Sequence, residues 1–391
     1  MMKKRNLLPA LVIVIIFFGG IFTGVLITGN KSESGQSNTI KIDNAPKSAI
    51  KPKEKALPQI DKTKSKVLIS YVQDYRDPNM IDYSKLTHVI FSFAHPTKDG
   101  GMLLNGDQPL KNLRTIVMKA KKTNTKVEIA VGGWFHMYGG ESYPYFQAAI
   151  SNPTSRTKLV NELTSFAVRE KLDGIDIDFE HPRSNADAQN LAAFAKELSQ
   201  QLHPKKKELS VAVYPKINAN TLKEIGAVKY DPSMFQYVDH VNIMAYDGQW
   251  DDGYHAENLS TYPYAEKIVE YWGNYFDQQK LSRDKLVLGV PLYAQPADPK
   301  IKQVSYSTIV NQNPANAAND TVKMNGTTYY YNGDTTMKKK TKLALEHGFG
   351  GMMLWEAGHD AQGPKSITSI LFGAIKDSSK EPLKYYTVKK N

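Results

Sequence analysis

The chain has 391 residues, 41% of them hydrophobic, which is enough for one large domain of about 250 residues or more with appendages. It has no cysteine, which excludes disulfide bonds and thiolate metal sites. The net charge of +11 lies at the two ends, because residues 1–66 hold twelve Lys and Arg against four Asp and Glu, and residues 376–391 hold five against two. The body between them is neutral overall, which argues against a nucleic-acid-binding protein.

The N-terminal segment, residues 1–29, is predicted to be an export signal. Lys3, Lys4 and Arg5 precede an uncharged run at residues 7–28, which is long enough to span a bilayer. A cleavable signal usually has a shorter apolar run and a small-residue cleavage site, and neither is clear here. We therefore expect an uncleaved anchor in the cell membrane with the folded body of the chain outside. The alternative is a signal cleaved near Gly29 and a secreted protein.

Residues 30–65 are rich in Lys, Ser, Asn and Pro, and are predicted to form a disordered linker. The basic linker and the basic tail, residues 376–391, lie where contact with anionic lipid or wall polymer is possible, but solvated lysines are the simpler interpretation.

Short apolar runs alternate with helical stretches between residues 66 and 375. Eight such runs predict a (β/α)8 TIM barrel, and the alternative is an open, doubly wound sheet. No glycine-rich nucleotide-binding motif follows any of these runs, which disfavours that alternative. The predicted strands are 67–71, 88–93, 127–131, 174–179, 209–213, 240–244, 286–290 and 351–354.

The fourth of these runs carries the most informative motif, LDGIDIDFEHP at residues 172–182. In a strand, Asp176, Asp178 and Glu180 share one face, opposite the apolar residues. An amphipathic strand with a solvated face has the same pattern, but a strand that ends between two helices places these acids where an α/β barrel keeps its chemistry. Like charges this close raise at least one pKa, which keeps an acid protonated for cleavage of a glycosidic bond.

This stretch resembles the DxxDxDxE signature of family 18 glycoside hydrolases, the retaining chitinases, and matches at all four acids. The resemblance implies that Glu180 is the proton donor, that Asp178 orients the substrate acetamido group, and that Asp176 exchanges a proton with Asp178. The following His181 and Pro182 are similar to the Tyr-Pro that follows the acid in chitinases.

Other strand ends extend the resemblance to nearly all of residues 67–373. Residues 131–134, Val-Gly-Gly-Trp, are similar to the family's S-x-G-G-W element, with Gly133 and Trp134 near sugar and Ala130 where a Ser is usual. That Ser normally helps to hold the inner Asp, so its loss is expected to alter proton sharing at Asp176. Without the Trp, a Gly-Gly pair would indicate only an ordinary turn.

Residues 244–247, Met-Ala-Tyr-Asp, resemble the family's M-x-Y-D after strand six. The resemblance implies that Tyr246 donates to the acetamido carbonyl, that Asp247 bonds the sugar at the cleavage site, and that Met244 lies in the same substrate-binding element. Trp355 would form an apolar floor beneath that sugar.

The seventh strand and its neighbours supply the remaining predicted substrate-binding residues. Tyr293 follows that strand. Ala294 and Gln295 stand where the family frequently has a Gly-Arg pair, so the contact that this pair makes in the wall of the cleft is not predicted here. Tyr71 and Phe93 stand where strands one and two present aromatic rings, although plain barrel packing explains them equally well. Residues 294–335 are predicted to be a short insertion that leaves an open cleft.

These residues together predict retaining, substrate-assisted hydrolysis of β-1,4 bonds in chitin or its N-acetylglucosamine oligosaccharides, without a cofactor. Two alternatives stay open: a hydrolase of another N-acetylglucosamine glycan, such as peptidoglycan or an N-glycan core, and a non-catalytic chitin-binding lectin. His181, His255 and His359 lack metal-ligand spacing, so no metal is predicted. We expect a monomer whose partners are its glycan substrate and, through the N-terminal segment, the membrane.

Overall fold

A computed structural model of the protein describes residues 65–378. The predicted anchor and nearly all of the predicted linker and basic tail lie outside the described residues, so these expectations stay predictions. Within residues 65–378, no helix is both long and apolar enough to cross a membrane.

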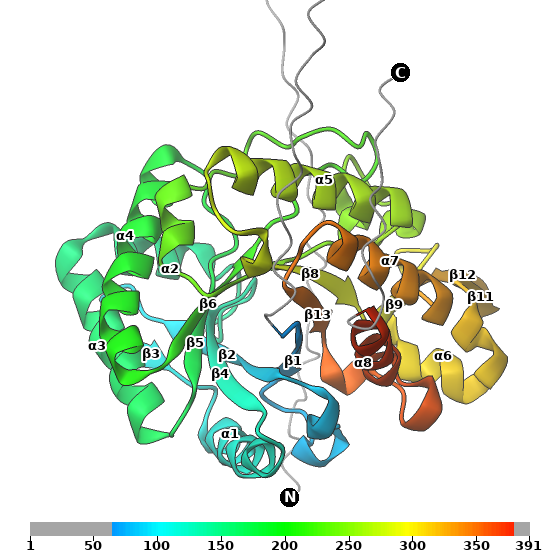
Figure 1. Ribbon diagram of the computed structural model, residues 1–391, viewed down its shortest axis with the longest axis horizontal. Coiled ribbons are helices and arrows are strands. Elements are labelled where there is room, and N and C mark those ends of the chain that lie inside the picture. The colour runs from blue at the N-terminus through cyan, green and yellow to red at the C-terminus, as the bar shows by residue number, and fades with distance from the viewer. Residues whose placement is uncertain (1–64, 379–391) are drawn as a thin grey trace, which may run out of the picture. The chain divides into compact units, whose positions relative to one another are not determined.

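Eight parallel strands form the closed sheet at the centre of the fold (Figure 1). Their neighbour order is β1-β13-β8-β7-β6-β5-β4-β2, and pairing between β1 and β2 closes the barrel. This confirms the predicted TIM barrel, and each predicted strand overlaps an observed one. The strands are β1 (Val67–Gln73), β2 (His88–Pro96), β4 (Lys126–Gly132), β5 (Gly174–Asp178), β6 (Glu208–Val213), β7 (His240–Ile243), β8 (Leu286–Pro291) and β13 (Gly351–Trp355).

Helices surround the strands, and polar caps fix where several of them begin (Figure 1). The Asn152 side chain accepts a hydrogen bond from the N–H of Thr154 at the start of α3, and Ser184 accepts from Asp187 at the start of α4. The helices around the barrel are α1 (Asp107–Ala120), α2 (Tyr143–Ser151), α3 (Pro153–Arg169), α4 (Asn185–Leu202), α5 (Tyr262–Gln278), α7 (Asp334–Glu346) and α8 (Ile367–Ser378).

Strand β5 separates its apolar and acidic side chains as the two-residue period predicts. Ile175 and Ile177 belong to the large hydrophobic core, whereas Asp176 is hydrogen bonded to side chains that face the inside of the barrel. A smaller hydrophobic cluster lines this inner side, and includes Tyr71, Ala130 and Tyr246. The acids therefore lie in the inner layer of a packed barrel, where burial controls their charge.

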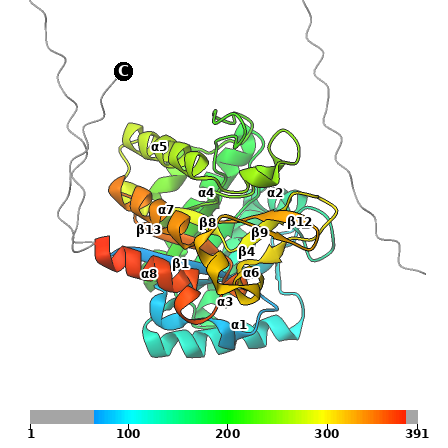
Figure 2. The ribbon, with the colours of Figure 1, turned by 90° about the vertical axis from the view of Figure 1, so that its right-hand side faces the viewer.

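A small antiparallel sheet lies between β8 and α7, where the sequence predicts an insertion. Its order is β10-β9-β12-β11, and it packs beside α6 (Tyr306–Gln312) on the side of the barrel that faces the viewer in Figure 2. Its strands are β9 (Tyr293–Pro296), β10 (Val304–Ser305), β11 (Thr321–Met324) and β12 (Thr327–Tyr330). The short strand β3 (Met102–Leu103) pairs with the end of β2. That the insertion leaves an open cleft stays a prediction.

Candidate active site

Asp176 is the best-anchored acid of the motif. Its carboxylate accepts hydrogen bonds from the Tyr71 hydroxyl (2.8 Å), the Ser210 hydroxyl (2.6 Å) and the Asn242 side-chain amide (3.3 Å). Burial raises the pKa of Asp176 to about 6, while these three donors act in the opposite direction. Asp176 is thus held rigidly from β1, β6 and β7, with a pKa that permits proton exchange near neutral pH.

Tyr71 supplies a hydroxyl rather than an exposed ring face. Its side chain is only 1% exposed, and Asn242 also donates to its oxygen over 3.1 Å. Burial raises the pKa of Tyr71 well above its usual value, so the phenol remains a donor. This location corrects the expectation that Tyr71 meets the substrate, because its position suits holding Asp176.

Glu128 lies beside Asp176 and was not predicted. The Ser210 hydroxyl lies 2.6 Å from one oxygen of Glu128 as well as from Asp176, and a single hydroxyl hydrogen can serve only one of them. Burial, followed by the nearby charges, raises the pKa of Glu128 well above its usual value. Glu128 in its protonated form can donate to Ser210, which then donates to Asp176, so these residues form a buried proton-holding chain.

Asp178 lies at the end of β5, next to a backbone turn that only glycine allows. A Cβ at Gly132, whose φ is +118°, would stand 2.0 Å from the Asp178 carbonyl oxygen, and a Cβ at Gly133 would strike the ring of Phe93. The Gly133 N–H donates to the same carbonyl oxygen over 2.9 Å. The two glycines therefore let the end of β4 pack closely against the end of β5, and the predicted approach of Gly133 to sugar stays a prediction.

Burial is the main cause of the raised pKa values of the acids. It raises the pKa of Asp178 well above the usual value, with the charges of Glu180 and Asp176 as smaller causes. It also raises the pKa of Glu180 to about 8, with Asp247 as the next cause. The sequence predicts like-charge repulsion as the cause, but removal of the carboxyl groups from water contributes more. At neutral pH, Glu180 is therefore a carboxylic acid that can give up a proton.

Tyr246 and Asp247 follow β7 and lie beside the acids. Burial and then the charge of Asp247 raise the pKa of Tyr246 well above its usual value, so Tyr246 is a neutral donor. The hydroxyl of Tyr293 and the side-chain amide of Gln249 donate to one oxygen of Asp247. Met244 is half-buried against the inner cluster. The predicted residues 244, 246, 247 and 293 are thus brought together at this end of the barrel.

Aromatic rings gather at the ends of β1, β2 and β13. Trp355 lies with its ring centroid 5.9 Å from that of Phe93 in a stacked arrangement, and 5.5 Å from that of Tyr71. Trp134 is 38% exposed, and its ring is 6.1 Å from that of His181. Trp355 and Phe93 thus form a half-buried aromatic pair at this end of the barrel, and their role as a sugar-binding platform stays a prediction.

This geometry, acids and aromatic rings at the carboxyl ends of the barrel strands, agrees with the relationship found by comparison. Residues 67–360 match the family described as glycosyl hydrolases family 18. The chain belongs to glycosyl hydrolase family 18.

Solved structures similar to this family 18 chain include chitinases. A chitinase from the chitin utilization locus of Flavobacterium johnsoniae is 25% identical, with a TM-score of 0.67 over 81% of this chain and 95% of that one. A Bacteroides thetaiotaomicron chitinase is 24% identical, with a TM-score of 0.68 over 82% and 100% of the two chains, and shows the shared fold.

Curated relatives are 26–29% identical to this chain, and the chain spans about half or less of the first two of them. "Probable chitinase 10" of Drosophila melanogaster is 29% identical over 237 residues, which are 56% of this chain but 10% of that protein. A "chitinase-like effector" of Moniliophthora roreri is 26% identical over 54% of this chain and 53% of its own length. "Chitinase 1" of Aphanocladium album is 26% identical over 79% of this chain and 84% of its own.

One departure from the family 18 pattern has a structural counterpart. Ala130, which replaces the usual Ser, is the β4 neighbour of Asp176. Ser210 on β6 donates to Asp176 from the other neighbouring strand. The only sequence signal for Glu128 and Ser210 was a polar residue inside each otherwise apolar strand, and such a signal does not tell which face of the strand looks inward.

Proposed function

We propose that the chain hydrolyses β-1,4 bonds between N-acetylglucosamine units of chitin or chito-oligosaccharides with retention of configuration. The observation that carries this proposal is that Glu180, whose pKa is raised to about 8, lies with the buried Asp178 and Tyr246 at one end of the barrel. An ordinary retaining glycosidase uses a second carboxylate as nucleophile, whereas family 18 is a substrate-assisted exception.

In the first step, the acetamido oxygen of the sugar attacks C1 while Glu180 protonates the glycosidic oxygen. The bond between C1 and that oxygen breaks, and the ring that forms is an oxazolinium ion. Tyr246 donates to the acetamido oxygen and holds it in line for attack. Asp178 has one oxygen, Oδ1, without a hydrogen-bond partner among the described residues, and this oxygen is available to accept from the acetamido N–H.

In the second step, Glu180 is a carboxylate and takes a proton from water. The water oxygen attacks C1, the oxazolinium ring opens, and Glu180 is protonated again. Asp178 stabilises the positive charge of the ring, and Asp176 with its three donors shares a proton with Asp178. Its pKa of about 6 makes Asp176 a suitable partner for that exchange near neutral pH.

A chitin-binding lectin is the main rival of a different class. A "chitinase-like agglutinin" from Robinia pseudoacacia shares this fold at 19% identity, with a TM-score of 0.65. A lectin has no use for a transferable proton, and the presence of Glu180 with a raised pKa favours the hydrolase. Hydrolysis of a different N-acetylglucosamine glycan would use the same residues.

The test is incubation of the full chain with N-acetyl chito-oligomers, purified peptidoglycan and an N-glycan core. We expect cleavage of the chito-oligomers with early release of the β-anomer, followed by NMR, and competition by a thiazoline mimic of the oxazolinium ion. Early α-anomer, or equal turnover of fully deacetylated oligomers, would contradict substrate assistance. Preferred cleavage of peptidoglycan would move the substrate to that glycan, and binding without cleavage would favour the lectin.

We also propose that residues 7–28 anchor the protein in the cell membrane with the barrel outside. The uncharged run between basic residues and a polar linker supports this location. Full-length protein should then fractionate with membranes and be released by protease that cuts within residues 30–64. Mature protein in the medium with an N-terminus near Asn30 would instead mean a cleaved signal.

A further inference from the structure

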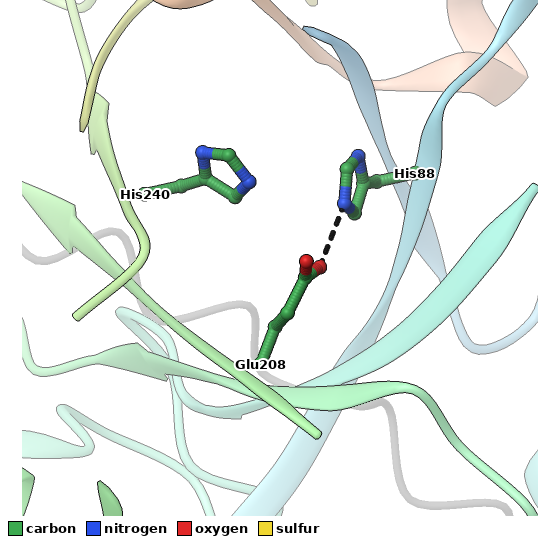
Figure 3. A group of neighbouring side chains, drawn as sticks. All are labelled: His88, Glu208 and His240. Atoms are coloured by element: carbon green, nitrogen blue, oxygen red, sulfur yellow. Dashed lines mark hydrogen bonds and ion pairs between the residues drawn. The ribbon is translucent and has the colours of Figure 1, made fainter. Parts of the chain in front are cut away.

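Three side chains that can ligate a metal meet at the end of the barrel opposite the acids. His88, Glu208 and His240 are the first residues of β2, β6 and β7, and Figure 3 shows them pointing toward one another. One potential ligand atom from each side chain lies within 4.8 Å of those of the other two. Strand β2 lies three places from β6 in the sheet order, so the cluster joins well-separated strands of the barrel wall.

Hydrogen bonds around His88 fix which of its nitrogens faces the cluster. The Thr87 hydroxyl donates to the carbonyl oxygen of Leu68 over 3.0 Å, so its hydrogen is already used. The 2.8 Å contact between Thr87 Oγ1 and His88 Nδ1 is therefore an N–H donation from the ring. This leaves Nε2 to face Glu208 Oε2 at 2.9 Å, and an N–H held by an oxygen is the usual support of a metal-binding histidine.

Glu208 and His240 supply the second and third candidate ligand atoms. Lys126 pairs with Oε1 of Glu208, and Oε2 is hydrogen bonded to His88 Nε2, so a cation would take the place of the proton between these two atoms. The His240 ring lies 5.1 Å from that of His88, and Figure 3 shows one of its nitrogens turned toward His88. The positive charge of Lys126 disfavours a cation at this cluster, whereas the negative charges of Glu208 and Asp239 favour one.

We propose that His88, Glu208 and His240 bind one Zn²⁺ ion, with water as the fourth ligand. Two imidazoles and one carboxylate are ligands that zinc accepts in a tetrahedral site. Ligand atoms around such an ion lie about 3.3 Å apart, given bonds of ~2.0 Å. Side-chain shifts of roughly 1–2 Å therefore close this cluster around the ion.

The ion has a structural role in this proposal. Ser210 follows Glu208 by two positions on β6, and Asn242 follows His240 by two positions on β7. Both side chains donate hydrogen bonds to Asp176. A metal that joins β2, β6 and β7 would brace the layer of the barrel directly below the acids. The ion takes no part in the proposed hydrolysis. A chain that binds no zinc could still hydrolyse chito-oligomers, and an inactive chain could still bind zinc, so the two proposals are tested separately.

The test measures zinc bound to the full chain, purified without a histidine tag and stripped with a chelator. We expect one Zn²⁺ per chain after dialysis, and a rise in melting temperature of about 5 °C at a zinc concentration a hundredfold above Kd. His240→Gln and Glu208→Gln should each weaken zinc binding about tenfold or more and remove the rise. The matched control is His347→Gln, which removes an exposed histidine that precedes β13 and should bind zinc as the unmodified chain does.

A second measurement needs no variant. Cu²⁺ bound at one equivalent should show electron-paramagnetic-resonance couplings to two histidine nitrogens. The proposal is overturned if the unmodified chain binds no stoichiometric zinc, if His240→Gln binds it as tightly as His347→Gln, or if copper shows coupling to fewer than two nitrogens.

Discussion

Replacement of Glu180 by Gln separates proton donation from the other tasks of the acids. With a pKa of about 8, Glu180 is about 90% protonated at pH 7, so nearly every molecule carries the proton that the leaving group needs. Gln keeps the size of the side chain and has no transferable proton. We expect kcat/KM on chito-oligomers to fall by about 10²–10⁴, which corresponds to roughly 3–5 kcal/mol of transition-state stabilisation.

The assay compares a natural oligomer with a substrate that carries an activated aryl leaving group. A phenolate whose phenol has a low pKa leaves without protonation. The first step catalysed by Glu180→Gln should therefore recover partly on that substrate. Asp178→Asn is the matched control, because it removes a neighbouring carboxylate without removing the acid. Its defect lies in positioning the acetamido group, which a better leaving group does not replace. Binding of chito-oligomers, measured by calorimetry, should persist in Glu180→Gln.

Two results would refute this reasoning. The first is a Glu180→Gln variant that keeps most of its activity on natural oligomers. The second is equal recovery of both variants on the activated substrate, which would mean that their roles do not differ as proposed.

The remaining predictions concern pH and stability. Because the protonated form of Glu180 is the active one, kcat/KM should fall as pH rises through about 8. Asp247→Asn removes the second cause of that raised pKa, so the basic limb of the pH profile should move to lower pH by roughly 1 unit. An unmoved basic limb would contradict the coupling between Asp247 and Glu180. Tyr71→Phe removes a hydrogen-bond donor that lowers the pKa of Asp176, so the acidic limb of the same pH profile should move to higher pH by about one unit. An unchanged acidic limb would argue against this contact. Gly132→Ala should lower the free energy of unfolding in urea by about 1–3 kcal/mol, because its Cβ would stand 2.0 Å from a backbone oxygen. Gly140→Ala, also at positive φ but with open space around it, is the control, and equal losses would show that backbone conformation rather than crowding sets the effect.

The sequence by itself determined the barrel and the identity of its acids. Strand β5 illustrates why: the two-residue period of a strand assigns Ile175 and Ile177 to one face and Asp176 and Asp178 to the other, whatever the rest of the fold. Each of the other seven barrel strands was also found from a local apolar run. Local patterns of this kind need only neighbouring residues, which the sequence supplies directly.

Only the tertiary structure decided how these acids are held and charged. Asp176 takes its donors from Tyr71, Ser210 and Asn242, which are 105, 34 and 66 positions away in the chain. Burial, the largest cause of the raised pKa values, depends on the closure of all eight strands. The cluster of His88, Glu208 and His240 was missed for the same reason, since its members are 120 and 32 residues apart and form no motif. Contacts between distant strands follow from barrel closure and register, which no local pattern in the sequence encodes.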